Sequence, residues 1–178
     1  PWWNKYIRRK RKHSDQGYNM MFNEQLKNVP LENHLNDDSL VVVWCTNSSQ
    51  HLNALRDEIF PKWGVKYVGK WYWVKITQSG EVVCPFSKPP RKQPFEQIIF
   101  AAKEERAFPN PPCDKLVVSI PSSLHSHKPP LTRLLESFLP SKPACLEVFA
   151  RYLLPDWTSY GNEVLRFQHE SLYVRVSG

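Results

Sequence analysis

A group of side chains that could bind a ligand stands in or directly after several apolar segments of the chain. They are Thr46 and Asn47 after SLVVVWC, Glu147, Phe149 and Arg151 in and after ACLEVF, and Gly161, Asn162 and Glu163 in DWTSYGNE. In open α/β sheets the ligand lies beyond the carboxyl ends of the strands, so these positions predict a site for a polar ligand with several hydrogen-bonding groups. Turn and capping chemistry is the alternative for each residue taken singly, because small polar residues are common in turns.

Several other kinds of site find no support in the sequence. It contains no G-x-S-x-G segment, which argues against a hydrolase of that type. His125 and His127 form an H-x-H pair, but no two further ligands stand at a usual spacing, so we predict no metal site. The four cysteines contain no C-x-x-C pair, and we expect them to be free thiols.

The chain is basic, with a net charge of +7, and this charge favours a polyanionic partner such as nucleic acid. Its strongest feature is a block of five consecutive basic residues. They are Arg8, Arg9, Lys10, Arg11 and Lys12. The block has three interpretations: a solvated loop, a nuclear import signal, or a loop that grips phosphates beside an active site.

The elements that must position these residues alternate between strands and helices. Apolar and β-branched runs predict strands over 39–46, 65–77, 96–103, 115–120 and 144–150, with 162–167 and 171–176 completing the sheet. Helical spacing predicts helices over 23–35, broken near Pro30, over 47–64, and over 128–139. The predicted fold is therefore α/β, a mostly parallel sheet with helices on both faces, in a single domain over 1–178. No apolar run approaches the roughly 20 residues of a membrane span, so we expect no membrane partner.

Seven segments occur in an order that resembles the MT-A-type adenine methyltransferases. They are PW at the start, VVVWCTN, WYWVKIT, KQPFE, SLHSHKPPL, LEVFAR and WTSYGNEVLRFQ. The resemblance covers essentially the whole chain and implies a Rossmann-like, circularly permuted class I methyltransferase fold that uses S-adenosylmethionine. Pro1 and Trp2 match the last two residues of the family's Asp-Pro-Pro-Trp motif. We therefore expect the domain to be incomplete at its N-terminus, and inactive without the upstream Asp and Pro.

The resemblance also implies roles for individual residues. Lys128 would pair with the methionine carboxylate of the cofactor; the alternative is an exposed surface lysine. The expected adenosine contacts are Glu147, Phe149 and Arg151, with Asn162 and Glu163 at the ribose. The expected contacts of the target base are Trp2 as a wall of the pocket, together with Pro1, Tyr18, Glu96 and His127. For Trp44, Trp71 and Trp73 we expect a place in the core, since aromatic residues in strands are usually packed.

The implied reaction is methyl transfer to the exocyclic N6 amine of adenine. The implied substrate is small nuclear RNA such as U2 snRNA, with DNA as a second class. We expect the protein to be a monomer without a metal. The nucleus is the expected location, with the cytoplasm as a second one. The alternative function is a non-catalytic, nucleic-acid-binding subunit that supports an active partner.

Overall fold

The computed structural model describes residues 1–3, 20–88, 91–103, 114–124 and 126–175. Its helices are α2 (Asn23–Lys27), η1 (Leu31–His34), α3 (Ser49–Ala54), η2 (Leu55–Ile59), α4 (Phe60–Lys62), α5 (Thr132–Leu135), η4 (Glu136–Phe138) and η5 (Glu170–Leu172). Its strands are β1 (Leu40–Cys45), β2 (Lys66–Lys75), β3 (Phe95–Ala102), β4 (Lys115–Ser119), β5 (Cys145–Val148) and β6 (Trp157–Tyr160). In the described part of the chain no helix is long and apolar enough to cross a membrane.

The strands form a four-stranded sheet in the order β1-β3-β2-β4 and a separate pair, β5-β6. Strand β3 runs antiparallel to both of its neighbours, β4 runs parallel to β2, and β5 runs parallel to β6. The prediction of a mostly parallel sheet is therefore wrong for the larger sheet, which is mixed. The wrong prediction comes from β3, whose residues are buried from Gln97 to Ala102. Burial on both faces produces a continuous apolar run whichever way the neighbouring strands point.

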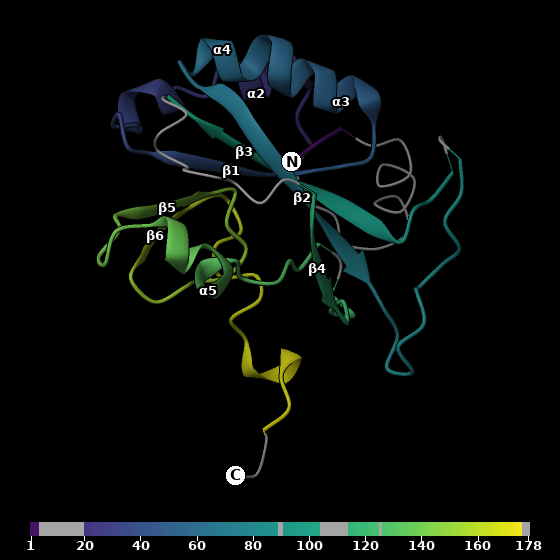
Figure 1. Ribbon diagram of the computed structural model, residues 1–178. Helices are drawn as coiled ribbons and strands as arrows, with labels where there is room; N and C mark the ends of the chain where they lie inside the picture. Colours follow the sequence, from purple (N-terminus) through teal and green to yellow (C-terminus); the bar gives the residue numbers. More distant parts are fainter. Residues whose placement is uncertain (4–19, 89–90, 104–113, 125, 176–178) are drawn as a thin grey trace.

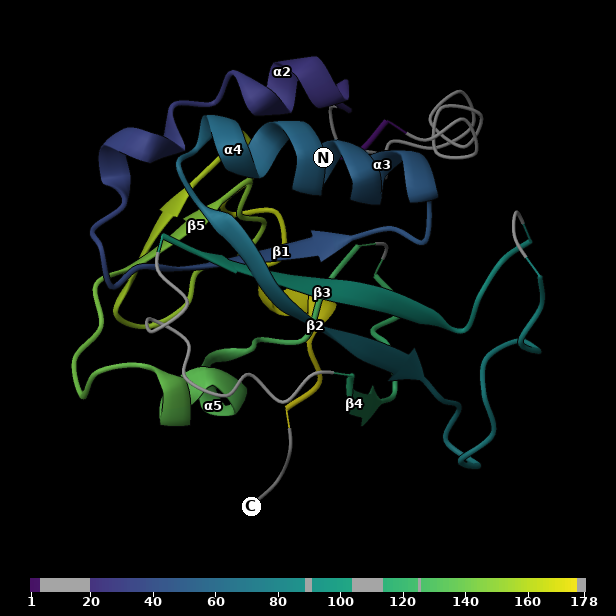
Figure 2. The same ribbon diagram turned by 45° about the horizontal axis from the view of Figure 1, so that its top comes forward.

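Helices cover both faces of the larger sheet, as predicted (Figure 1). On one face, Leu55, Ile59 and Phe60 of the continuous helix α3–η2–α4 share a core cluster with Ile99 and Ala101 of β3. On the other face, the alternate residues of β3 join a second cluster that includes residues of α5. Figure 2 shows α5 on the side of the sheet opposite to α3 and α4. The members of this second cluster include Ile98, Phe100, Trp71, Trp73, Leu131 and Leu135. This alternation fixes the register of β3, because a one-residue slip would exchange the two faces.

The predicted element boundaries are confirmed in most of the chain. The helix over 47–64 ends at Gly64, whose φ of +70° is a conformation that glycine adopts at little cost. The region 23–35 is broken near Pro30 into α2 and η1, as expected. The helix predicted over 128–139 is shorter and consists of α5 and η4. The described cysteines, Cys45, Cys84 and Cys145, are free.

The C-terminal part of the chain differs from the prediction. Residues 162–167 form turns rather than a strand. Ser171 and Leu172 belong to η5, residues 173–175 form no strand, and Val176 lies outside the described residues. The strand that pairs with β5 is Trp157–Tyr160, for which no strand is predicted and which lies inside the segment DWTSYGNE that carries candidate ligand contacts. The backbone of Ala150 donates a hydrogen bond to the carbonyl of Tyr160 at 3.0 Å, so the two strands stay joined beyond β5.

Candidate active site

Three charged side chains from different parts of the chain form an ion cluster at one end of the larger sheet. Glu96 lies in β3 beside the end of β2, and one of its carboxylate oxygens accepts a hydrogen bond from Lys75 of β2. The other oxygen accepts from Lys128, in the segment between β4 and α5. Each of the three side chains is only about one-fifth exposed, at 21–23%. The cluster carries one net positive charge, which suits it to a ligand carboxylate.

The environment of this cluster changes the acidity of its members. Burial alone would raise the pKa of Glu96, but the positive charges of Lys128 and Lys75 together lower it. Burial lowers the pKa of Lys128, and the charge of Glu96 opposes that shift. The ammonium of Lys128 also lies 5.7 Å and 5.6 Å from the ring centres of Trp44 and Trp73. Cation–π attraction to two rings helps to hold this partly desolvated charge in place.

A second cluster connects the His127–Lys128 segment to the residues that follow β5. The hydroxyl of Tyr152 donates to the carbonyl of Lys128 at 3.1 Å. The ring of His127 lies 5.0 Å from that of Tyr152 and 4.9 Å from that of Phe167. Arg151 makes an ion pair with Glu163 at 2.9 Å, and its guanidinium lies 4.4 Å from the centre of the Phe167 ring. Burial, and then the charge of Arg151, lower the pKa of His127, so its neutral ring is favoured.

Buried oxygen atoms without partners mark the β5–β6 pair. Glu147 of β5 and Ser159 of β6 occupy paired positions in the ladder. The Oε2 atom of Glu147 and the Oγ atom of Ser159 are buried, and neither has a hydrogen-bond partner among the described residues. Burial raises the pKa of Glu147. Buried polar groups are normally satisfied, so this pair of oxygens is a candidate contact for a ligand that can donate hydrogen bonds.

The turn after β5 is strained and tightly packed. Phe149 has a φ of +65°, which is unusual for a bulky residue and costs on the order of 1–3 kcal/mol. Gly161 lies opposite this turn, and a Cβ atom built on it would be 3.1 Å from the Phe149 Cα atom and from the Ala150 nitrogen. Asn162, the next residue, is exposed. Strain of this kind occurs preferentially at functional sites.

Trp2 lies in the hydrophobic core rather than on an open surface. It is 5% exposed, and its indole nitrogen donates to the carbonyl of Trp44 at 2.8 Å. Pro1, next to it, is partly buried, and its carbonyl accepts a hydrogen bond from the backbone of Met21 at 2.7 Å. The predicted contact of Trp2 with adenine stays a prediction.

The structure brings five of the predicted site residues, Glu96, His127, Lys128, Arg151 and Glu163, into the two charged clusters. Glu96 and Lys128 are hydrogen-bonded to each other. Tyr152 bonds the carbonyl of Lys128, and the ring of His127 packs against the rings of Tyr152 and Phe167. The Phe167 ring in turn lies against the guanidinium of Arg151, which pairs with Glu163. Tyr18 and the basic block Arg8–Lys12 lie outside the described residues, as does His125. The core position of Trp71 and Trp73 is confirmed, although Trp73 also faces Lys128.

Four residues of these clusters were missed: Lys75, Tyr152, Ser159 and Phe167. The position of Lys75 beside Glu96 follows from the register of β2 against β3, and the position of Ser159 beside Glu147 from the register of β5 against β6. A local sequence pattern reveals neither register. Tyr152 and Phe167 belong to segments that contain predicted residues, but nothing in their spacing marks them.

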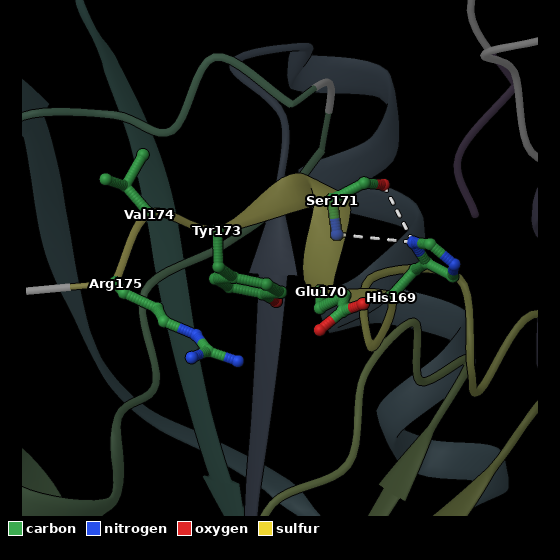
Figure 3. A pocket seen from close by; sticks show the side chains of 6 residues that line it. All are labelled: His169, Glu170, Ser171, Tyr173, Val174 and Arg175. Carbon is green, nitrogen blue, oxygen red and sulfur yellow. Dashed lines mark hydrogen bonds between the residues drawn. The ribbon is translucent and has the colours of Figure 1, made fainter.

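A surface hollow of about 540 Å³ lies elsewhere, in the C-terminal segment (Figure 3). Its lining consists of His169, Glu170, Ser171, Tyr173, Val174 and Arg175. All of these residues come from one short stretch of chain, and none belongs to the predicted site. The hydroxyl of Tyr173 donates to the carbonyl of Phe167, so the hollow adjoins the second cluster without containing a predicted site residue.

Comparison with known proteins gives these clusters a family context. The MT-A70 family model matches residues 1–163. The N(6)-adenine-specific methyltransferase METTL4 of Mus musculus is 41% identical over 99% of this chain and 38% of its own length. The N6-methyladenosine RNA methyltransferase MTA1 of Pyricularia oryzae is 38% identical over 84% of this chain and 40% of its own length. A DNA N6-methyl methyltransferase of Caenorhabditis elegans is 36% identical over 98% of this chain and 46% of its own length.

The chain thus spans about two-fifths of the length of these relatives. The MT-A70 match includes Trp2, both charged clusters as far as Glu163, and the β5–β6 pair. The chain belongs to the MT-A70 family of methyltransferases.

Proposed function

We propose that the full-length protein transfers a methyl group from S-adenosylmethionine to the exocyclic N6 amine of adenine in nucleic acid. One observation carries this proposal: the unpartnered oxygens of Glu147 and Ser159 occur in the same MT-A70 region as the net positive Lys75–Glu96–Lys128 cluster. Oxygens of this kind suit the hydroxyls of a ribose, and a net positive cluster suits a carboxylate. S-adenosylmethionine carries both groups.

The residues present fit this cofactor. Lys128 has three N–H donors, of which Glu96 uses one, so donors remain for the methionine carboxylate. A ribose hydroxyl that donated to Glu147 would satisfy its buried oxygen and offset the desolvation that raises its pKa. Phe149 and Arg151 would border the adenosine, and Asn162 would bond its ribose, with Glu163 holding Arg151 in place. When bound, the cofactor supplies an electrophilic methyl group on a sulfonium sulfur.

The work left to the chain is mainly to position the acceptor. An adenine amine is a weak nucleophile because its lone pair is delocalised into the ring. Acceptors aimed at its N–H groups favour a pyramidal nitrogen, and a fixed, dry surface around the base keeps it in line with the methyl group. Residues 1–3 suit that task because they are anchored: Met21 donates to the carbonyl of Pro1 at 2.7 Å, and Trp3 donates to the carbonyl of Met21 at 3.0 Å.

The finer parts of the proposal concern substrate and setting. The Pyricularia relative is named for RNA and the Caenorhabditis relative for DNA, so the names of these relatives support nucleic acid as a class. We propose small nuclear RNA such as U2 snRNA as the first substrate to test and DNA as the second. The circularly permuted order, a single catalytic domain over 1–178, a monomeric state and a nuclear location also remain proposals.

Two measurements on the full-length protein test the proposal. Calorimetric titration with S-adenosylmethionine should show binding, and incubation with an adenine-containing RNA or DNA oligonucleotide should yield N6-methyladenine after digestion to nucleosides. Binding without transfer would favour the alternative of a non-catalytic, nucleic-acid-binding subunit. If S-adenosylmethionine does not bind, both the site and the enzymatic function are refuted.

A further inference from the structure

His51, in the first turns of α3, contacts three separate segments of the chain. Its Nε2 atom lies 3.1 Å from the carbonyl oxygen of Trp3, and its Nδ1 atom lies 2.7 Å from the side-chain oxygen Oδ1 of Asn23 at the start of α2. Its ring centre is 5.1 Å from that of Trp2, at an angle of 39°. The side chain is partly buried between these groups.

The contact with Trp3 fixes a hydrogen on Nε2. A carbonyl oxygen can only accept, so Nε2 carries the hydrogen and donates it to Trp3. Burial lowers the pKa of His51, which favours the neutral ring. The Nδ1 atom faces the Oδ1 atom of Asn23, which is likewise an acceptor, so that contact favours a hydrogen on Nδ1 as well. His51 therefore joins α3 to the Trp2–Trp3 segment through its Nε2–H group and lies against α2 at Asn23.

This arrangement completes the attachment of residues 1–3. Met21 holds the backbone of Pro1 and Trp3 from the side of α2, and Trp44 of β1 accepts from the indole of Trp2. Neither of these bonds uses the carbonyl of Trp3, which His51 holds from α3. Loss of the His51 bond would leave Trp3 free to rotate its peptide plane and would remove a packing surface from Trp2.

We propose that His51 is a positioning residue for methyl transfer: its Nε2–H group holds the Trp3 carbonyl and thereby keeps Pro1 and Trp2 in the geometry that the acceptor base needs. This inference rests on the proposed function. It assigns His51 no contact with cofactor or substrate. Its effect should appear in kcat, since a displacement of about 1 Å at an acceptor site can cost about 100-fold in rate.

Two substitutions in the full-length protein distinguish the contact made by Nε2 of His51 from the contact made by its Nδ1. The amide nitrogen of His51→Gln can reach the position of Nε2 and keep the bond to Trp3, whereas the shorter side chain of His51→Asn can replace only Nδ1. We expect kcat to fall by about 10- to 100-fold in His51→Asn and to stay within about threefold in His51→Gln. KM for S-adenosylmethionine should stay within about threefold in both variants, since His51 does not touch the proposed cofactor site. His34→Asn, at an exposed position in η1, is the matched control.

Equal losses of kcat in the two His51 variants, in proportion to their melting temperatures, would overturn the proposal. So would an unchanged kcat in His51→Asn. A second readout does not depend on activity: hydrogen exchange of the Trp3 amide should accelerate by about 10-fold or more in His51→Asn and by less than about threefold in His51→Gln. If the wild-type protein transfers no methyl group, the proposed function is refuted, and this exchange measurement still decides whether His51 anchors the segment.

Discussion

Replacing Glu96 by Gln gives the sharpest test of the ion cluster. The substitution keeps the shape of the side chain and removes the negative charge between Lys75 and Lys128, so two ammonium groups then face each other without a counter-charge. Breaking a buried ion pair by removing one partner costs about 3–5 kcal/mol. The side chains are 21–23% exposed, so solvent screens part of this loss, and we expect about 2–3 kcal/mol. In a chain of this size that corresponds to a fall in melting temperature of about 4–12 °C.

The pH dependence of this effect has a definite sign. The neighbouring lysines lower the pKa of Glu96 in the folded state below its ordinary value of 4.5, against the effect of burial. A carboxyl group with a lowered folded pKa binds fewer protons in the folded state than in the unfolded state. Its stabilising contribution is therefore fully present above about pH 4.5 and is lost as the pH falls through the lowered value. The difference between wild type and Glu96→Gln should shrink over that range.

Thermal and urea unfolding of both proteins, at pH 7 and then at steps down to about pH 3, provide the measurement. Glu81→Gln, at an exposed position in the turn after β2, is the matched control and should shift the melting temperature by less than about 1 °C. A shift in Glu96→Gln no larger than that of the control at pH 7 would refute the reasoning. A difference from wild type that grows as the pH falls would refute it too.

The other predictions concern ligand binding and packing. Lys75→Met and Lys128→Met each remove one partner of Glu96 and should lower the melting temperature similarly, but only Lys128→Met should weaken S-adenosylmethionine binding, by about 10-fold or more in a calorimetric titration; equal losses of affinity would contradict the assigned role. Glu147→Gln removes a buried charge, so its melting temperature should be unchanged or higher while cofactor affinity falls; a lower melting temperature with unchanged affinity would make Glu147 structural. Gly161→Ala should lower the melting temperature, because the new methyl group would press on the turn after β5, and equal melting curves would contradict this packing. Neutral residues at Arg8–Lys12 should reduce the salt dependence of oligonucleotide binding by about 0.7 in log–log slope for each lost phosphate contact; an unchanged slope would leave the solvated-loop and nuclear-import interpretations.

The elements with strong local signals could be predicted from the sequence, and their mutual arrangement could not. The apolar run of β3 and the helical spacing of Leu52, Leu55 and Ile59 each identify an element by itself. The direction of β3 depends on which strands lie beside it, and that is a property of the folded chain. A continuous apolar run reports burial on both faces and leaves the direction open.

Strand β6 shows the opposite kind of error. Its four residues, Trp157–Tyr160, are suited to a strand by their aromatic and β-branched side chains, but they lie beside the turn residues Gly161 and Asn162. Gly161 and Asn162 are typical of a turn, and four residues are too few to show a clear alternation of apolar and polar side chains, so the pattern predicts no strand here. The apolar character of 162–167 and 171–176 predicts strands, whereas the described residues there, 162–167 and 171–175, form turns, part of η5 and irregular chain.

For the candidate site, residue types could be predicted better than contacts. Lys128 and Glu96 were both expected in the site, the first at the cofactor and the second at the base, yet the structure pairs them with each other. That contact, like the part played by Lys75, depends on three segments meeting in space. His51 was interpreted only as a residue of a helix, because its role follows from the carbonyl of Trp3 and the side chain of Asn23, 48 and 28 positions away.

The most direct test of the central claim is to follow the methyl group itself. Full-length protein is incubated with methyl-labelled S-adenosylmethionine and an adenine-containing oligonucleotide, which is then digested to nucleosides and analysed by mass spectrometry. The account predicts the label on N6 of adenine, with yield lost in Lys128→Met and retained in Lys75→Met at a temperature where both variants are folded. Label on another position or base, or bound cofactor with no transfer to RNA or DNA, would contradict it.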